Sequence, residues 1–218
     1  MDTPVCAKCD YKFCHRGVTD PKVLPDFCPM KLHKNVIEES LGEYERDMEL
    51  RKLYVNATIC EYEAYDTSGG RFTPVRPRVR ELIEFAKKIG VEKIGIAFCI
   101  GLSREARALT EVLESHGFKV YSALCKCGAV DKVKLHVPAE YKLRGPDKFE
   151  AACNPVLQAR LLNMAGTQLN VIVGLCIGHD IIFTRYSKAP VTTLIVKDRL
   201  TGHNPAVALY TYYHRAYL

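Results

Sequence analysis

The feature that most constrains the fold is an alternation of apolar strands with helical patterns, which begins near Val91. The predicted strands are almost continuously apolar and cover residues 93–98, 118–124, 169–175 and 191–196. Helical patterns fill the intervals at 103–116, 154–165 and 179–186. Buried strands that alternate with helices are typical of a parallel sheet covered on both faces. We therefore expect an α/β fold with an open, mostly parallel sheet of about four strands.

The chain before the sheet divides into two further predicted parts. Residues 1–34 are a cysteine-rich, metal-binding segment, and residues 35–90 are a helical connector packed on the core. Apolar residues at steps of three to five predict a helix at 35–54 that continues toward Tyr65. Residues 91–218 then form a Rossmann-like domain, with a small strand predicted at 133–137 and a final helix in 202–218.

Four cysteines lie within the first 28 residues, in the spacing Cys6-x2-Cys9-x4-Cys14-x13-Cys28. One metal ion needs four soft ligands from a compact loop, and a short polar segment of this kind has too little apolar surface to fold unaided. We expect these four cysteines to bind zinc, with an iron–sulfur cluster as the alternative, because the spacing matches neither common ferredoxin pattern.

Disulfides in an exported protein would also account for the N-terminal cysteines. The sequence Met1-Asp2-Thr3-Pro4 is neither basic nor apolar, which does not suit a signal peptide. Ten cysteines in all are then expected as reduced thiols in the cytoplasm.

The composition argues against two classes of partner. No run approaches the roughly 20 apolar residues of a membrane span. The net charge is +6, but basic and acidic residues are mixed, as in residues 38–51, so we do not expect nucleic-acid binding.

A second set of cysteines falls at the ends of the predicted strands. These residues are Cys99, Cys125, Cys127, Cys153 and Cys176. Because parallel strands place their carboxyl ends at one edge of the sheet, where ligands bind, we expect the five thiols to converge there. Converging thiolates favour an iron–sulfur cluster. Zinc, a redox dithiol and simple burial as small apolar side chains are the alternatives.

Two of these junctions share a Cys-Ile-Gly core, at Cys99 and at Cys176. Glycine permits a tight turn there and offers backbone amides that stabilise anionic sulfur. Catalytic residues are not identified, but His179, Asp180 and Lys197 are candidates because they lie near the same edge. A thiol enzyme with Cys176 as nucleophile and His179 as base is a further alternative.

Several motifs together resemble one family. They are the N-terminal cysteine segment, Cys153-Asn154-Pro155, Leu175-Cys176-Ile177-Gly178-His179-Asp180, Tyr186-Ser187-Lys188-Ala189-Pro190-Val191, Lys197-Asp198-Arg199 and Gly202-His203-Asn204-Pro205. The family is a bacterial and archaeal domain-of-unknown-function family of cysteine-rich, predicted metal-binding proteins, frequent in anaerobes. The resemblance implies metal binding and supplies no reaction.

Two functions are therefore expected from the sequence. The first is a cytoplasmic metalloprotein with a second, thiolate-ligated centre at the sheet edge, acting with a redox partner or on a small-molecule substrate. The second is a non-catalytic zinc-binding or interaction module.

Overall fold

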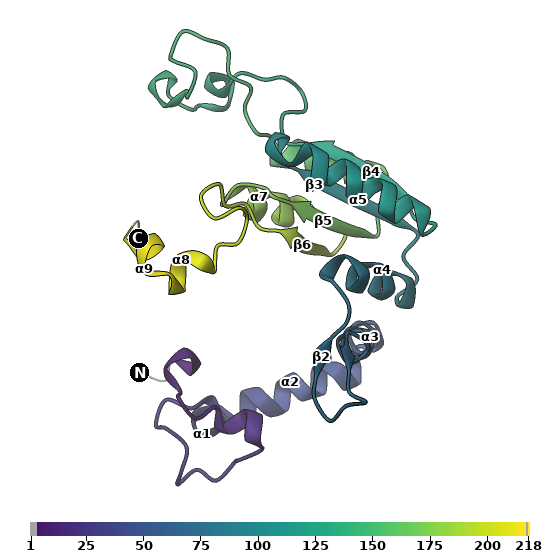
Figure 1. Ribbon diagram of the computed structural model, residues 1–218, viewed down its shortest axis with the longest axis vertical. Helices are drawn as coiled ribbons and strands as arrows, with labels where there is room; N and C mark the ends of the chain where they lie inside the picture. Colours follow the sequence, from purple (N-terminus) through teal and green to yellow (C-terminus); the bar gives the residue numbers. More distant parts are fainter. Residues whose placement is uncertain (1–3, 217) are drawn as a thin grey trace. The chain divides into compact units, whose positions relative to one another are not determined.

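The computed structural model describes residues 4–216 and 218, which form two compact units. The first unit runs to Ile59 and the second begins at Cys60 (Figure 1). Within the described residues, no helix is both long and apolar enough to cross a membrane.

The first unit consists of short helical elements around the cysteine segment. They are η1 (Cys6–Lys8), η2 (Phe13–Arg16), α1 (Pro29–Leu32), α2 (Lys34–Arg46) and α3 (Met48–Glu63), the last of which runs on into the second unit. The single helix predicted at 35–54 is instead divided at Asp47. The Asp47 carboxylate accepts hydrogen bonds from the backbone N–H groups of Glu49 and Leu50, both at 2.9 Å, which caps a new helix.

The first unit has almost no apolar core. Of residues 4–59, Leu24 is the only buried apolar residue. Conformational entropy opposes the folding of so small a unit, and little apolar burial offsets it. The unit thus needs another source of stability.

The second unit is built on the predicted parallel sheet. Its strands are β3 (Lys93–Phe98), β4 (Lys119–Leu124), β5 (Leu169–Val173) and β6 (Val191–Ile195), in the order β4-β3-β5-β6. All three strand pairings are parallel, with a register shift between β5 and β6 at Ile172 and Val173. The α/β architecture is confirmed.

Four helices accompany this sheet: α4 (Arg78–Lys88), α5 (Ser103–Ser115), α6 (Pro155–Met164) and α7 (His179–Tyr186). The right-handed rule for parallel crossovers places α5 on one face and α6 and α7 on the other. Figure 1 shows α5 in front of β3 and β4. Every residue of β5 is buried, as expected for a strand covered on both faces.

The strand order contains a topological switch point. From β3 the chain moves outward to β4, and it then returns to the other side of β3 to form β5. The loops after β3 and β5 therefore diverge at the carboxyl edge of the sheet, where α/β proteins bind their ligands.

The remaining elements are short, and several differ from the prediction. Two-residue strands β1 (Tyr65–Asp66) and β2 (Thr73–Pro74) pair antiparallel. The strand predicted at 133–137 is wrong, because Asp131 caps a 3₁₀ turn, η4 (Lys132–Leu135), by accepting a hydrogen bond from the N–H of Val133 at 3.1 Å. Two further 3₁₀ turns are η3 (Ile100–Leu102) and η5 (Ala139–Tyr141).

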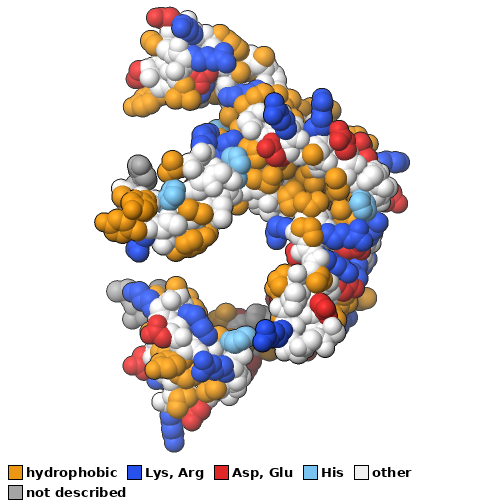
Figure 2. Space-filling model, viewed as in Figure 1, with side chains coloured by type: hydrophobic (Ala, Val, Ile, Leu, Met, Phe, Trp, Pro, Cys, Tyr) orange, Lys and Arg blue, Asp and Glu red, His pale blue; other side chains and the backbone are white. Residues whose placement is uncertain are grey.

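The C-terminal segment forms two four-residue helices in place of the single helix predicted. They are α8 (Val207–Tyr210) and α9 (Tyr212–Arg215). Their aromatic side chains, including Tyr212 and Tyr213, are exposed, and they contribute to the apolar surface seen near the chain's C-terminus in Figure 2.

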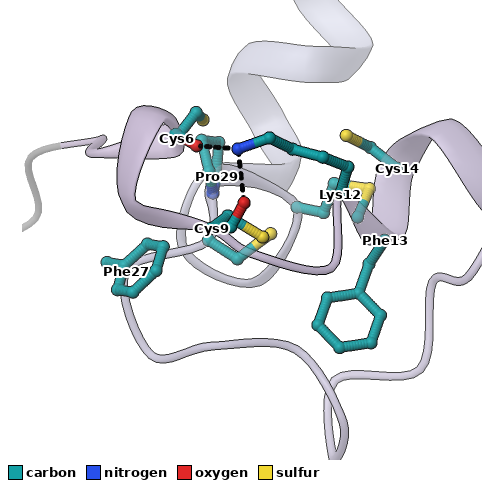
Figure 3. Close-up of a pocket in the computed structure, with 9 residues that line it drawn as sticks. Cys6, Cys9, Lys12, Phe13, Cys14, Phe27 and Pro29 are labelled. Carbon is teal, nitrogen blue, oxygen red and sulfur yellow. Dashed lines mark hydrogen bonds between the residues drawn. The ribbon is translucent and has the colours of Figure 1, made fainter. Parts of the chain in front are cut away.

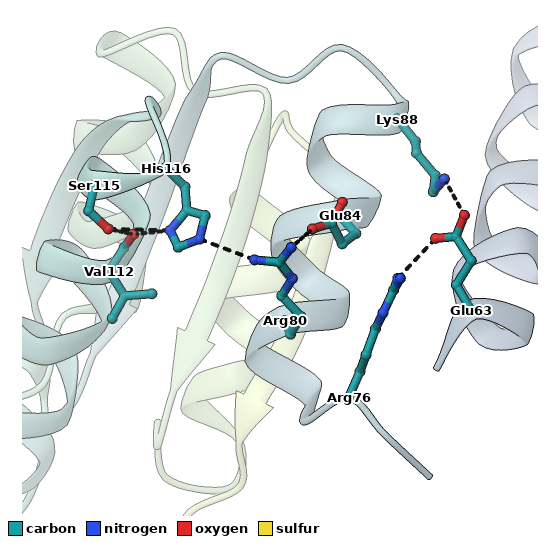
Figure 4. Close-up of polar contacts among 8 residues, drawn as sticks. All are labelled: Glu63, Arg76, Arg80, Glu84, Lys88, Val112, Ser115 and His116. Carbon is teal, nitrogen blue, oxygen red and sulfur yellow. Dashed lines mark hydrogen bonds and ion pairs between the residues drawn. The ribbon is translucent and has the colours of Figure 1, made fainter. Parts of the chain in front are cut away.

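Polar contacts surround α4 within the second unit. Glu63 accepts hydrogen bonds from Arg76 and Lys88, each at 2.9 Å (Figure 4). Arg80 pairs with Glu84 at 2.7 Å and contacts His116, at the end of α5, at 3.3 Å.

Candidate functional site

The carboxyl edge of the sheet brings three cysteine side chains into a row. Cys99 follows β3 and Cys125 follows β4, so the two continue the parallel register side by side. Cys153 arrives from the loop before α6, where the backbone N–H of Asn154 donates to the carbonyl of Cys125 at 2.8 Å. The central side chain, Cys125, is in hydrogen-bond contact with both Cys99 and Cys153, and the two neighbouring sulfurs share its single S–H hydrogen.

The local sequence explains why Cys153 lies there. Asn154 caps α6 by accepting a hydrogen bond from the N–H of Leu157 at 2.9 Å, and Pro155 occupies the first helical position. Both features agree with the prediction from the sequence. Capping holds the chain immediately before the helix against the end of β4.

The pKa values of the three thiols differ strongly, since those of the two outer thiols are lowered and that of the central thiol is raised. The hydrogen bond from Cys125, the backbone N–H of Gly101 and the Lys197 ammonium, 3.5 Å from the sulfur, lower the pKa of Cys99 to about 5, although burial opposes them. Hydrogen bonds from Cys125 and from His179 lower the pKa of Cys153 to about 4. The pKa of Cys125 is raised far above its ordinary value, because its proton bridges two thiolates and its side chain is buried.

His179 is the partner of Cys153. Its hydrogen bond to that sulfur raises the pKa of the imidazole, against the effects of burial and of Lys126. Asp180 adds a smaller effect in the same direction as Cys153, and its carboxylate accepts a hydrogen bond from the N–H of Ile181 at 2.8 Å. His179 therefore forms its hydrogen bond with Cys153, the cysteine before α6, whereas one hypothesis from the sequence paired His179 with Cys176.

Cys176 lies on the other side of the switch point. It follows β5, and its sulfur accepts a hydrogen bond from the Arg199 guanidinium at 3.1 Å. Cys127 lies in the turn after β4, where its N–H donates to the carbonyl of Leu124 at 3.1 Å. Among the described contacts, neither Cys127 nor Cys176 joins the row of three sulfurs through its side chain.

The cations that face the sulfurs come from a loop after β6. The Asp198 carboxylate accepts hydrogen bonds from the N–H groups of Leu200 and Thr201, and the ring of His203 accepts one from the N–H of Asp198 at 3.1 Å. This folded loop carries Lys197 and Arg199 toward the two Cys-Ile-Gly turns. Gly101 leaves the room for Lys197, because a Cβ at that position would lie 2.9 Å from the ammonium nitrogen.

Two residues of the site were missed by sequence reasoning. The Lys126 ammonium donates to the carbonyl of Ala151 and acts by its charge on Cys153 and His179, and the position of Lys126 between two cysteines in the sequence was a signal. Gln158 is fully buried and donates to the carbonyls of Phe98, at 3.3 Å, and Ala123, at 2.7 Å, while its own carbonyl oxygen has no partner. Nothing in its local sequence distinguishes it from any other polar helix residue.

The four N-terminal cysteines line one cavity of about 240 Å³ (Figure 3). The other lining residues are Lys12, Phe13, Phe27, Pro29 and Met30. The Lys12 ammonium donates to the backbone carbonyls of Cys6, at 3.1 Å, and Cys9. A positive charge therefore stands beside four soft donors.

The ten cysteines all belong to the described part of the chain and are free thiols. Within residues 4–216 and 218, no three His, Cys, Asp or Glu side chains are grouped as the ligands of one ion would be. Cys60, left unassigned by the sequence, is buried in α3, and burial raises the pKa of its thiol. Its position is that of a small core residue.

Comparisons with known proteins identify relatives without a described activity. Residues 28–194 match a family described as proteins of unknown function, DUF1847, and this match leaves out Cys6, Cys9 and Cys14. The "Uncharacterized protein MJ0455" of Methanocaldococcus jannaschii is 42% identical over 209 residues, which cover 96% of this chain and 95% of that protein.

Proposed function

The chain belongs to the DUF1847 family, and from that premise we propose that it is a metalloprotein with a thiolate-ligated centre, an iron–sulfur cluster, at the carboxyl edge of the sheet. The observation that carries this proposal is the row of Cys99, Cys125 and Cys153 beside the topological switch point. Thiolates are the ligands that iron–sulfur clusters use in most proteins. Cys176, across the switch point, is the proposed fourth ligand.

The charges around the row support an anionic occupant. Lys197 and Arg199 contact the sulfurs of Cys99 and Cys176, and Lys126 and His179 stand beside Cys153. The N–H of Ile100 donates to the sulfur of Cys125 at 3.4 Å. Hydrogen bonds and positive charges near the sulfurs stabilise an anionic cluster and raise its reduction potential.

The donor chemistry fits such a centre, but the side chains are arranged as hydrogen-bonded thiols. The described residues hold no convergent group of three ligands, so binding requires the cysteine side chains to turn toward a common point. Ligand thiols bind as thiolates, and the bridging proton of Cys125 would then be released. Uptake of the centre should therefore release protons and become weaker as the pH falls.

The residues of the chain have separate roles in this proposal. When bound, the centre would supply electron transfer or polarise a small-molecule substrate. Lys197 and Arg199 would offset negative charge at the sulfurs of Cys99 and Cys176, and His179 would hold a proton near Cys153. The thiols suit a reducing compartment, so the proposal includes a cytoplasmic location.

A second metal site is proposed in the first unit. All four N-terminal cysteines face one cavity, and Leu24 alone is buried among the apolar residues at 4–59. Zinc held by Cys6, Cys9, Cys14 and Cys28 would supply the folding free energy that this small core does not. If this were the only metal in the chain, the function would be that of a zinc-binding interaction module.

The proposal is tested by the metal content of protein purified without oxygen. Iron, zinc and acid-labile sulfide are measured per chain, together with the visible spectrum. We expect a coloured protein in which Cys99→Ser and Cys153→Ser lose iron and sulfide while they keep zinc. Cys9→Ser should lose zinc alone, and Cys60→Ala, which changes a cysteine that neither proposed site includes, should lose neither. A colourless wild-type protein with zinc but no sulfide would leave only the interaction module.

A further inference from the structure

The backbone holds Cys125 and Cys153 next to each other independently of any metal. Besides the bond from Asn154 to the carbonyl of Cys125, the N–H of Ala152 donates to the carbonyl of Val130 at 2.7 Å. The segment before α6 therefore runs beside the segment after β4. The side chains of Cys125 and Cys153 are in hydrogen-bond contact on these neighbouring backbones, so the two sulfurs are placed where they can join in a disulfide.

The two thiols differ in accessibility. Only 2% of Cys125 is exposed, so an external molecule does not reach its sulfur. Cys153 is partly exposed and receives hydrogen bonds from Cys125 on one side and from His179 on the other. An accessible outer sulfur beside an imidazole and an inner, protected sulfur in contact with it are the parts that thiol–disulfide exchange requires.

We infer that Cys153 and Cys125 form a thiol–disulfide exchange pair that reduces small anionic disulfides. The thiolate of Cys153 attacks one sulfur of the external disulfide, whose S–S bond breaks as a mixed disulfide forms. The leaving thiolate takes a proton from the His179 imidazolium. Cys125 then loses its proton by way of the neutral imidazole and attacks the sulfur of Cys153, which releases the second product thiol.

The electrons balance across these two steps. The external disulfide gains two electrons and two protons and becomes two thiols, while the protein is left with a Cys125–Cys153 disulfide. An external dithiol reductant restores the pair by the reverse exchange. This activity goes beyond the proposed metal centre, since the same sulfurs do not exchange while they ligate a metal.

The charges at the site select the substrate class. The Lys126 ammonium, which donates to the carbonyl of Ala151, acts by its charge on Cys153 and His179, and Arg199 and Lys197 line the neighbouring turns. Of the nearby carboxylates, Asp180 accepts the N–H of Ile181, and Asp198 accepts the N–H groups of its own loop. The cations outnumber these two groups, so anionic disulfides are attracted and cationic ones repelled.

The test uses the full chain, as purified and after metal removal, with oxidised glutathione as the probe. Intact mass and peptide mapping follow the sulfurs. The wild type should form the Cys125–Cys153 disulfide and keep no glutathione on either of these two residues. Cys125→Ser should retain one glutathione on Cys153. Cys153→Ser should form no disulfide with Cys125 and hold no glutathione at position 153, and Cys127→Ser should behave as the wild type.

Several outcomes would overturn the inference. They are retention of glutathione on Cys153 in the wild type, a wild-type disulfide between Cys99 and Cys125, or unchanged exchange in Cys153→Ser. The circular dichroism spectrum of each variant must match that of the wild type. Oxidised glutathione should react severalfold faster than cystamine, a cationic disulfide, and Lys126→Gln should reduce this preference; an equal rate for both refutes the substrate class.

The metal assay separates this inference from the proposed function. If the protein contains iron and sulfide but shows no thiol–disulfide exchange, either as purified or after metal removal, the exchange pair is refuted and the metal centre stands. Exchange in a chain that binds no iron would refute the centre and leave the pair.

Discussion

A single added methyl group at Gly174 should disturb both Cys-Ile-Gly turns at once. Gly174 follows β5 with φ +66°, and a Cβ there would lie 2.6 Å from a methyl carbon of Leu102. Leu102 is fully buried in the turn after Cys99. Gly174→Ala therefore adds a steric conflict to the cost of a left-handed backbone.

The magnitude follows from two contributions. A left-handed alanine costs about 1–2 kcal/mol, offset by about 0.4–1 kcal/mol from the less flexible unfolded chain. Overpacking against Leu102 adds about 1–3 kcal/mol. We expect Gly174→Ala to lower the free energy of unfolding by about 2–4 kcal/mol, which moves the urea midpoint by about 1–2 M for a slope near 2 kcal/mol/M.

Gly166 provides a matched control. Its φ of +67° is nearly the same, but the nearest atom to its Cβ would be the Lys93 ammonium at 3.8 Å, an ordinary contact. Gly166→Ala should therefore show only the backbone cost of about 1 kcal/mol. Urea unfolding followed by circular dichroism compares the two variants, and equal midpoints would refute the conflict with Leu102. The double variant Gly174→Ala/Leu102→Ala should be less destabilised than the sum of its single changes.

Three further predictions concern the second unit. In metal-free protein, iodoacetamide should alkylate Cys153 down to a pH of about 4, and His179→Gln should raise the pH at which the alkylation rate is half its maximum. A half-maximal pH near the ordinary pKa of a free thiol in the wild type would contradict the hydrogen bonds to Cys153. Because the pKa of Cys153 is depressed by folding, the stability contributed by the thiolate is complete above its ordinary pKa and is lost as the pH falls toward about 4. Glu63→Gln removes two ion pairs and should lower the thermal unfolding midpoint at low salt but not at high salt. Glu111→Gln, on an exposed helix surface, is the control and should leave the midpoint unchanged at both salt concentrations. Asn154→Ala removes the α6 cap and should cost about 1 kcal/mol in urea unfolding, and it should slow the reaction of Cys153 with oxidised glutathione; an unchanged rate would separate the cap from the thiol site.

Local patterns in the sequence were sufficient for the elements of the sheet. The apolar runs at β3 and β5 and the Asn154-Pro155 helix start are encoded within a few residues, so their positions were predictable. Where a polar side chain competes with the pattern, prediction failed. Asp47 divides a helix by capping its second half, and Asp131 turns an expected strand into a 3₁₀ turn.

The sequence by itself determined that cysteines follow successive parallel strands, because the direction of such strands places their carboxyl ends at one edge. Only the tertiary structure decided which thiols meet. The order β4-β3-β5-β6 sets Cys99 beside Cys125, and the cap of α6 brings Cys153 to the same point. As a result, His179 forms a hydrogen bond with Cys153, while the sulfur of Cys176 accepts one from Arg199. Strand order and loop packing depend on contacts between distant segments, which the pattern along the chain does not contain.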